Sequence, residues 1–182
     1  PKVGYKRKLL DVCIKNADMN LKEVVIKKIK REDFIPKTLK ELKKALSMKK
    51  LPKRIEAFDN SNFQGSSPVA GMVCFINGRP VKKEFRRFNI KTVSGINDYK
   101  SMEEVVTRRY SRQKKSGKEL PDLILIDGGK GQLSAAKKAL KDLSLNHINI
   151  AGIAKKLEEV FIPGNKFPQN INKSSPALYL LR

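Results

Sequence analysis

The residues of this sequence most capable of chemistry lie in the stretch LILIDGGKGQ, from Leu123 to Gln132. An apolar run ends there at Asp127, and a glycine-rich loop with one lysine, Lys130, follows directly. An aspartate at the end of a strand either forms a turn or holds something positive. Bare glycines let backbone N–H groups approach an anion, and a helix that begins after them favours negative charge. The stretch therefore indicates either a simple turn or a cation site next to a phosphate-binding loop.

The loop does not match the common nucleotide-binding patterns. It lacks the glycine spacing of a Walker A loop, and Gly131 rather than Ser or Thr follows the lysine. It is not a dinucleotide fingerprint either, because Ser134 stands at the last glycine position of that motif. The phosphate that it would bind is therefore predicted to belong to a nucleic acid.

A second aspartate, Asp59, ends another predicted strand, RIEAFDNS. If the two strands are parallel neighbours, Asp59 and Asp127 share one cleft, because ligands of open α/β sheets lie beyond the carboxyl ends of the strands. Two carboxylates ~4 Å apart repel by ~4 kcal/mol at an effective dielectric of 20, so such a pair needs a proton or a cation. Either aspartate alone is explained as a turn residue. Together, in a basic chain, they predict a site for Mg²⁺ or Mn²⁺.

Charge is the dominant feature of the composition. Forty Lys and Arg against eighteen Asp and Glu give a net charge of +22, which predicts a polyanionic partner. Nucleic acid is a better candidate than a membrane, because the sequence shows no basic amphipathic helix with an aromatic face. A compositional bias towards lysine is the alternative, with the basic side chains merely solvating exposed faces. The candidate DNA contacts are Arg86, Arg87, Arg108, Arg109, Lys130 and Lys155.

Cysteine and histidine argue against other chemistries. Cys13 and Cys74 lie far apart in unlike contexts and are expected to be reduced thiols of a cytoplasmic protein. His147 is the only histidine, so a histidine-based zinc site or a Ser-His-Asp triad is not supported. The first residue is Pro1 rather than Met, which predicts a piece of a longer polypeptide.

The elements that must position these residues follow from periodicity. Residues 1–50 are predicted to be a basic helical extension or linker, and residues 51–182 the α/β domain. The domain should hold a mixed sheet, with a three-stranded antiparallel meander followed by alternating helices and strands. Asp98 begins the first of these helices, where the N-cap or the first turn is the usual place for Asp. The expected strands are 54–59, 69–80, 81–90, 120–127 and 148–154, with a small strand and turn in 158–167; the expected helices begin near Asp98, Leu133 and Ser175.

These residues, in this order, resemble the C-terminal endonuclease half of the UvrC family, which belongs to the bacterial excinuclease ABC system. The resemblance covers nearly the whole chain, and its most specific blocks are DGGKGQL and FRRFNI. The other matching blocks are KRKLLDVCIKNA, LPKRIEAFDNSNFQG, GINDYKSMEEVVTRRYSR, IAGIAKKLEEVFIPG and SSPALYLLR.

The resemblance implies an RNase H-like fold and a Mg²⁺-dependent endonuclease of nucleotide excision repair that incises the damaged DNA strand 5′ of a lesion. It places the family's carboxylates on Asp59, Asp98 and Asp127 and raises Asp98 from a helix-start residue to an active-site residue. It also implies UvrB as a partner of the full-length protein, through a segment outside this sequence. The alternatives are a basic nucleic-acid-binding module without chemistry and another RNase H-like nuclease, such as a junction resolvase.

The sequence departs from the family at several positions. Asn60 and Asn62 replace an aliphatic residue and a histidine, and Asn97 replaces the first acidic residue of the family's DDY. The family's catalytic histidine lies beyond ALYLL, whereas this sequence ends at Arg182. The resemblance therefore implies that this chain binds metal and DNA but cuts weakly or not at all.

Overall fold

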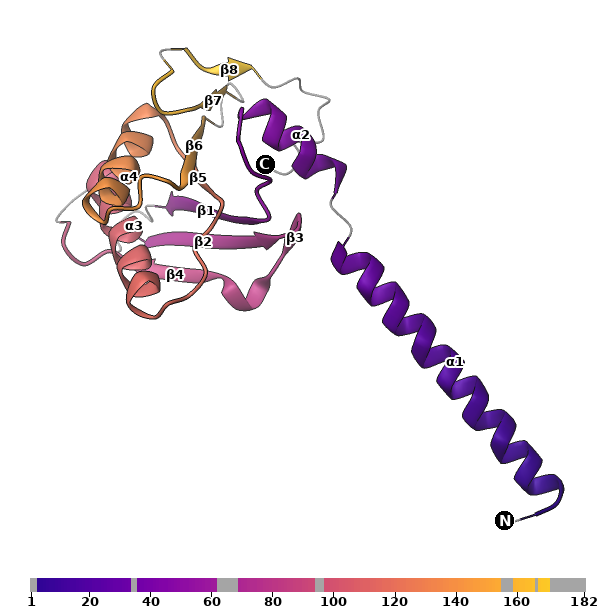
Figure 1. Ribbon diagram of the computed structural model, residues 1–182. Helices are drawn as coiled ribbons and strands as arrows, with labels where there is room; N and C mark the ends of the chain where they lie inside the picture. The colour runs from indigo at the N-terminus through magenta and orange to yellow at the C-terminus, as the bar shows by residue number, and fades with distance from the viewer. Residues whose placement is uncertain are drawn as a thin grey trace. The chain divides into compact units, whose positions relative to one another are not determined.

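The chain divides into two units, residues 1–35 and residues 36–182. The first unit holds one helix, α1 (Tyr5–Asp33), in the region where helical spacing was predicted. The second unit holds the sheet and the remaining helices (Figure 1). The computed structural model describes residues 3–33, 36–61, 69–93, 97–154, 159–165 and 167–170.

No helix within these described ranges has both the length and the apolar character needed to cross a bilayer. Many apolar side chains of α1 are nevertheless exposed, among them Leu21 with 63% of its surface accessible.

The second unit is built on one mixed sheet with the order β3-β2-β1-β5-β6-β7-β8, and β4 pairs with β2 as well. β1, β5 and β6 run parallel at its centre, and the remaining pairs are antiparallel. This confirms the predicted mixed α/β sheet. The strands are β1 (Arg54–Ser61), β2 (Val69–Ile76), β3 (Arg79–Pro80), β4 (Arg86–Asn89), β5 (Leu123–Asp127), β6 (Asn149–Ala154), β7 (Glu159–Phe161) and β8 (Gln169–Asn170).

The predicted third strand, 81–90, is only partly extended. Its first half forms a single 3-10 turn, η1 (Lys82–Glu84). Within this segment, only the residues of β4 pair with β2. In the turn before it, Asn77 and Gly78 both adopt positive φ values, 51° and 75°. Such values match the right-handed twist of a hairpin.

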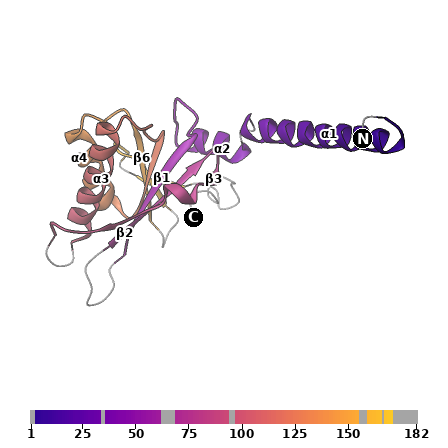
Figure 2. The same cartoon turned by 90° about the horizontal axis from the view of Figure 1, so that it is seen from below.

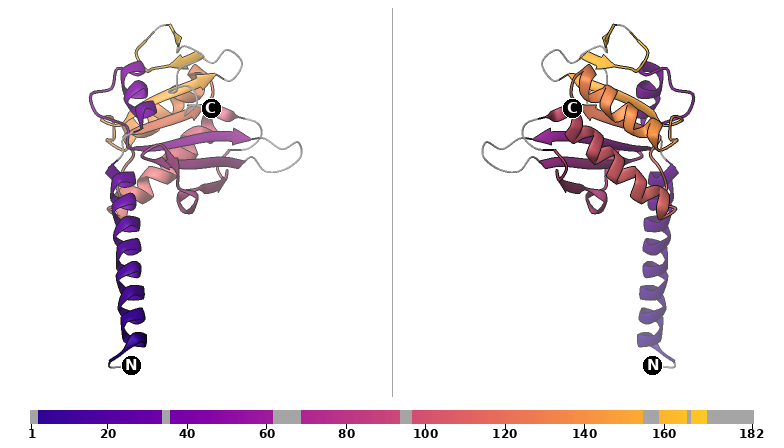
Figure 3. Two further views of the ribbon diagram at one scale, coloured as in Figure 1. Left: turned by 90° about the vertical axis from the view of Figure 1, so that its right-hand side faces the viewer. Right: turned by 90° about the vertical axis from the view of Figure 1, so that its left-hand side faces the viewer.

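The helices cover both faces of the sheet. α3 (Asp98–Lys115) and α4 (Lys130–Asp142) lie side by side on one face (Figures 2 and 3). α2 (Lys37–Ala45) packs on the other face. We refer to these as the α3 face and the α2 face.

The core on the α3 face is built on a stripe of side chains along one side of α3. Met102, Val105, Val106 and Tyr110 are all fully buried. Tyr110 meets Phe58 of β1 edge to face, with ring centroids 6.1 Å apart. This stripe determines which side of α3 packs against the sheet.

The core on the α2 face corrects the predicted domain boundary. Leu39 and Leu42 of α2 are fully buried and pack in one cluster with Ile55 and Leu123. Helical periodicity was present in this segment, but it does not say what a helix packs against. The domain therefore begins at Pro36 rather than at residue 51.

Hydrogen bonds at the start of β1 and β5 set the register of these two strands. The Arg54 N–H donates to Asp122 Oδ2 at 2.9 Å, and the Asp122 N–H donates to the Arg54 carbonyl at 2.9 Å. Asn149 at the start of β6 donates its side-chain amide to the Asp122 carbonyl at 3.0 Å. One residue thus ties together the starts of all three parallel strands.

Leu42→Ala should lower the free energy of unfolding of the domain by about 2–5 kcal/mol, because it empties a fully buried site. Leu21→Ala in α1 is the matched control and should cost less than about 0.5 kcal/mol, since that side chain is exposed. Urea unfolding of both variants measures the difference. Equal effects would mean that α2 belongs to the extension after all.

Candidate active site

Asp59 and Asp127 lie directly opposite each other on neighbouring parallel strands. They are register partners, Asp59 near the end of β1 and Asp127 at the end of β5. Paired residues of adjacent strands are roughly 4.8 Å apart and present their side chains on the same face of the sheet. Asp59 is exposed and Asp127 is half-buried, so solvent reaches the pair. The parallel pairing on which the predicted cleft depended is therefore present.

Burial shows which face carries the two carboxylates. Along β5, Leu123 and Leu125 belong to the core of the α2 face, and Ile124 and Ile126 to the core of the α3 face. Asp127 continues the first set, because side chains alternate along a strand. The carboxylate pair therefore stands on the α2 face, at the carboxyl end of the parallel strands.

Asp98 reaches the same end of the sheet from the α3 face. It lies in the first turn of α3, and the helix is capped by Asn97, whose side chain accepts a hydrogen bond of 3.0 Å from the Lys100 N–H. Asn60 donates its amide to the Asp98 carbonyl at 3.0 Å. The residue next to Asp59 thus holds the start of α3 against the end of β1. Sequence comparison marked Asn60 only as a departure from the family.

A hollow of about 490 Å³ opens between the starts of α3 and α4. Asp98 and Tyr99 line it from α3, and Gly129 with the first residues of α4, Lys130 to Gln132, line it from the other side. A Cβ at Gly131 would lie 2.4 Å from the Tyr99 ring, so a larger residue there would require this ring to move. The glycine-rich loop therefore faces Asp98 across a solvent-filled space.

The donor set of the carboxylate pair fits a hard divalent cation. Mg²⁺ is commonly held by one or two carboxylates and several waters. Among the residues that the structure describes, no three His, Cys, Asp or Glu side chains form a group that could hold a metal ion. The pair therefore offers two ligands, and the part of Asp98 in catalysis stays a prediction.

A buried ionic network, which sequence reasoning missed, anchors α3 to β1. Glu56 is completely buried, and its carboxylate accepts hydrogen bonds from Arg54 at 2.9 Å and from Arg109 at 2.8 Å. Tyr110 donates its hydroxyl to the same carboxylate at 3.0 Å. Burying charges is tolerated only when they are paired in this way. Three residues before Asp59, the network fixes β1 against the helix that carries Asp98.

The network shifts two pKa values. Burial by itself raises the pKa of Glu56, but hydrogen bonds and charges from Arg109 and Arg54 outweigh it and hold the pKa below its usual value. Burial, together with the Glu56 charge, raises the pKa of Tyr110 well above its usual value. Glu56 is thus ionised and Tyr110 protonated, which matches the direction of their hydrogen bond.

The same network removes Arg109 from the predicted DNA contacts, because only 10% of its side chain is exposed and its guanidinium is engaged with Glu56. Arg108 is also mainly structural. It donates to the Asn89 carbonyl at 2.7 Å and pairs with Glu104 at 2.8 Å, which ties α3 to the end of β4. We therefore leave both arginines out of the proposed DNA surface.

The remaining predicted DNA contacts differ in their exposure and surroundings. Arg87 and Lys130 are exposed, and Lys130 lies 5.3 Å from the centre of the Phe161 ring. Arg86 is exposed as well but turns back on its own loop, where it donates to the carbonyls of Lys83 and Phe85. Lys155 lies outside the described residues, as do Asn62 and the helix expected from Ser175.

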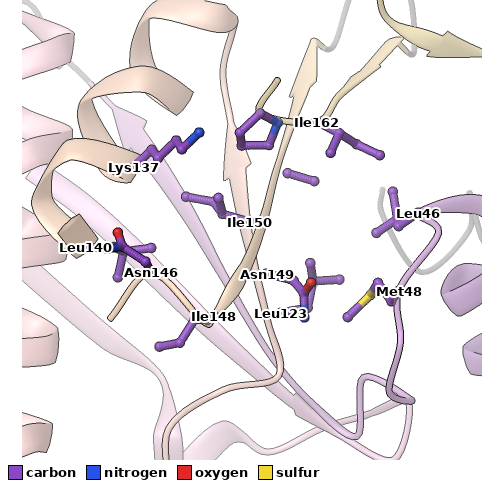
Figure 4. A pocket seen from close by; sticks show the side chains of 12 residues that line it. Leu46, Met48, Leu123, Lys137, Leu140, Asn146, Ile148, Asn149, Ile150 and Ile162 are labelled. Atoms are coloured by element: carbon purple, nitrogen blue, oxygen red, sulfur yellow. The ribbon is translucent and has the colours of Figure 1, made fainter. Parts of the chain in front are cut away.

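A second hollow, of about 330 Å³, lies at the opposite end of the parallel strands (Figure 4). Leu46, Met48, Leu123 and Ile150 give it an apolar wall, and Lys137 reaches over it. No acidic side chain of the described residues lines it. Leu123 begins β5 whereas Asp127 ends it, so this hollow is separate from the carboxylate pair.

Comparisons with known proteins agree with this architecture. The family model described as the UvrC RNase H endonuclease domain matches residues 43–182. The chain therefore belongs to the family of UvrC RNase H endonuclease domains, and its sheet is of the RNase H-like class.

Curated relatives carry the name UvrABC system protein C. The protein from Cytophaga hutchinsonii is 50% identical over 100% of this chain and 30% of its own length. That from Prosthecochloris aestuarii is 47% identical over 100% of this chain and 30% of its own length. The chain thus spans less than a third of the relatives that it matches. A solved structure of endonuclease V from Ciona intestinalis aligns with 65% of this chain and 51% of that chain, at 19% identity and a TM-score of 0.43, which is too loose a likeness to bear on function.

Glu56→Gln should lower the free energy of unfolding by about 3–5 kcal/mol at pH 7, because it leaves two buried arginines without their counter-charge. It should also make the free energy of unfolding depend less steeply on pH in the acidic range, which we call the acid limb. Since the folded pKa of Glu56 lies below its ordinary value of 4.5, its contribution is complete above that pH and is lost as the pH falls through the folded pKa.

Chemical unfolding of wild type and variant from pH 7 downwards measures both effects. Glu103→Gln on the partly exposed surface of α3 is the control and should keep the wild-type acid limb. Equal flattening in the two variants would contradict the role given to Glu56.

Proposed function

We propose that this chain is a metal-dependent DNA endonuclease domain that acts in nucleotide excision repair and incises the damaged strand 5′ of a lesion. The observation that carries the proposal is the register of Asp59 with Asp127 at the open end of the parallel strands. Membership of the UvrC family supports the assignment to excision repair and the RNase H-like nuclease chemistry. The side of the incision rests on the resemblance alone.

In the proposed mechanism, Asp59 and Asp127 would hold Mg²⁺ or Mn²⁺. Bound there, the ion would polarise a phosphodiester and lower the pKa of a coordinated water. Asp98, which faces the glycine loop, is proposed to orient an attacking water or to accept a proton from it. The alternative is that Asp98 only stabilises the start of α3, where a negative charge is favourable.

The proposed DNA surface consists of Lys130, the start of α4 and Arg87. A helix N-terminus is a favourable place for a phosphate, because backbone N–H groups of a first turn can donate to it and the helix dipole favours negative charge there. The net charge of +22 supports binding that is directed mainly at the DNA backbone. UvrB is the proposed partner of the whole protein, because the curated relatives are named as part of the UvrABC system, and we propose a cytoplasmic location.

A basic binding module without chemistry is the competing function. It would need the charge but not the carboxylate pair, so titration of metal separates the two. A junction resolvase is the other alternative, and it would prefer four-way-junction DNA to a lesion-bearing duplex.

Asp127→Asn should lower the affinity for Mn²⁺ by at least about tenfold, since even residues that only orient metal ligands typically contribute that much. It should also abolish any nicking of a lesion-bearing duplex. Calorimetric titration with Mn²⁺ measures the affinity, and a gel assay measures nicking. Asp142→Asn, on the exposed end of α4, is the control and should behave as wild type. Unchanged Mn²⁺ affinity in Asp127→Asn would favour the binding module.

DNA affinity should fall steeply with salt, each neutralised phosphate adding about −0.9 to the slope of log K against log salt concentration. Lys130→Ala should make the slope shallower by about one such unit. Lys118→Ala is the matched control, because it removes an exposed lysine that precedes β5 instead of following it. Fluorescence anisotropy at several salt concentrations gives the slopes. A salt-insensitive affinity would contradict backbone-directed binding.

A further inference from the structure

The row of paired residues that contains the two carboxylates continues across the sheet to an arginine. Asp59 pairs with Gly71 of β2, and Gly71 pairs with Arg87 of β4. Residues that pair directly across strands present their side chains on the same face. Asp59 and Arg87 therefore stand on the α2 face, two strand spacings or roughly 10 Å apart at their Cα atoms.

The place between them is open. Gly71 has no side chain and is exposed, as are Asp59 and Arg87. A Cβ built on Gly71 meets no atom of the described residues within 4 Å. Gly71 is not among the glycines with positive φ, so a larger residue would fit its extended backbone. The row thus has an open position at Gly71, which we call the floor, with the carboxylate of Asp59 at one end and the guanidinium of Arg87 at the other.

We propose that this floor seats one phosphate of the nucleic-acid backbone, held by Arg87 on one side and by the metal bound at Asp59 and Asp127 on the other. The inference rests on the proposed function and names the residue that positions the substrate. Two carboxylates repel a phosphate beside them, whereas a bound cation reverses the local charge. Arginine suits the opposite side, because its planar guanidinium binds phosphate through two parallel hydrogen bonds.

This phosphate position between Arg87 and the metal, which we call the seat, makes the binding of metal and of DNA interdependent. A phosphate that touches both the metal and Arg87 must bind more tightly when the metal is present, and the metal must bind more tightly when DNA is present by the same factor. Exposed basic residues elsewhere add to DNA affinity but not to this coupling. The coupling therefore separates a phosphate seat from a general electrostatic contribution.

Arg86 provides a matched control within the same strand. It carries the same charge one residue earlier and is exposed like Arg87. It pairs with Met72, which is buried in the core of the α3 face, so the two arginines project from opposite faces. A loss caused by Arg87 alone cannot be a loss of net charge.

The experiment measures the affinity for a short lesion-free duplex with and without Mn²⁺ at constant ionic strength. The wild type should bind more tightly with Mn²⁺. Arg87→Ala should remove about tenfold or more of that gain, as expected for hydrogen bonds between charged groups, and should leave Mn²⁺ affinity without DNA unchanged. Arg86→Ala should keep the gain, and Arg87→Lys should restore it in part.

Gly71→Val tests the floor itself. Valine is favoured in strands and would occupy the open space, so the variant should fold and keep its thermal unfolding midpoint or raise it. It should lose the Mn²⁺-dependent gain as Arg87→Ala does.

The outcomes separate the two levels of the proposal. If the wild type shows no Mn²⁺-dependent gain, the proposed function fails and the seat fails with it. If the gain is present but Arg87→Ala keeps it, or Arg86→Ala loses it equally, the seat alone is overturned. If Arg87→Ala loses the gain and a folded Gly71→Val keeps it, no phosphate sits over Gly71 and the seat is likewise overturned.

Discussion

The candidate site depends on the parallel pairing of β1 with β5. These strands lie far apart in the sequence, and the hydrogen bonds between Arg54 and Asp122 fix where their pairing starts. From that start, the register carries Asp59 to Asp127 at the other end. A slip by one residue would turn one of the carboxylates to the opposite face. The proposed metal site is therefore a consequence of strand register.

β1 serves both faces of the sheet at once. On the α3 face, three of its side chains contact α3. Glu56 does so through the ionic network, Phe58 through an aromatic contact and Asn60 through a hydrogen bond. On the α2 face, β1 presents Asp59. A buried ionic network is a poor source of net stability compared with an apolar core, but breaking it is costly. We infer that it holds α3 in one position, which keeps Asp98 at the same end of the sheet as the carboxylate pair.

Local patterns predicted the sheet, the end of β5 at Asp127 and the helix that begins at Asp98, because each depends on residues that lie close together in the sequence. β1 runs on to Ser61, two residues past the predicted end of its strand. Local patterns could not show that α2 belongs to the domain, since its leucines are buried only by strands that follow later. The role of Glu56 was hidden for the same reason: Arg109, its partner, lies 53 residues away. Arg109 in turn looked like a surface cation. Contacts between distant segments, rather than composition, decide which charged residues remain available to DNA.

A crystal structure of the chain grown with Mn²⁺ is the most direct test of a shared metal at the end of β1 and β5. The account predicts one anomalous peak within ~2.0–2.6 Å of a carboxylate oxygen of Asp59 and of Asp127. A peak bound by only one of these residues, a peak at another place, or two carboxylates turned away from each other with no ion between them would contradict it.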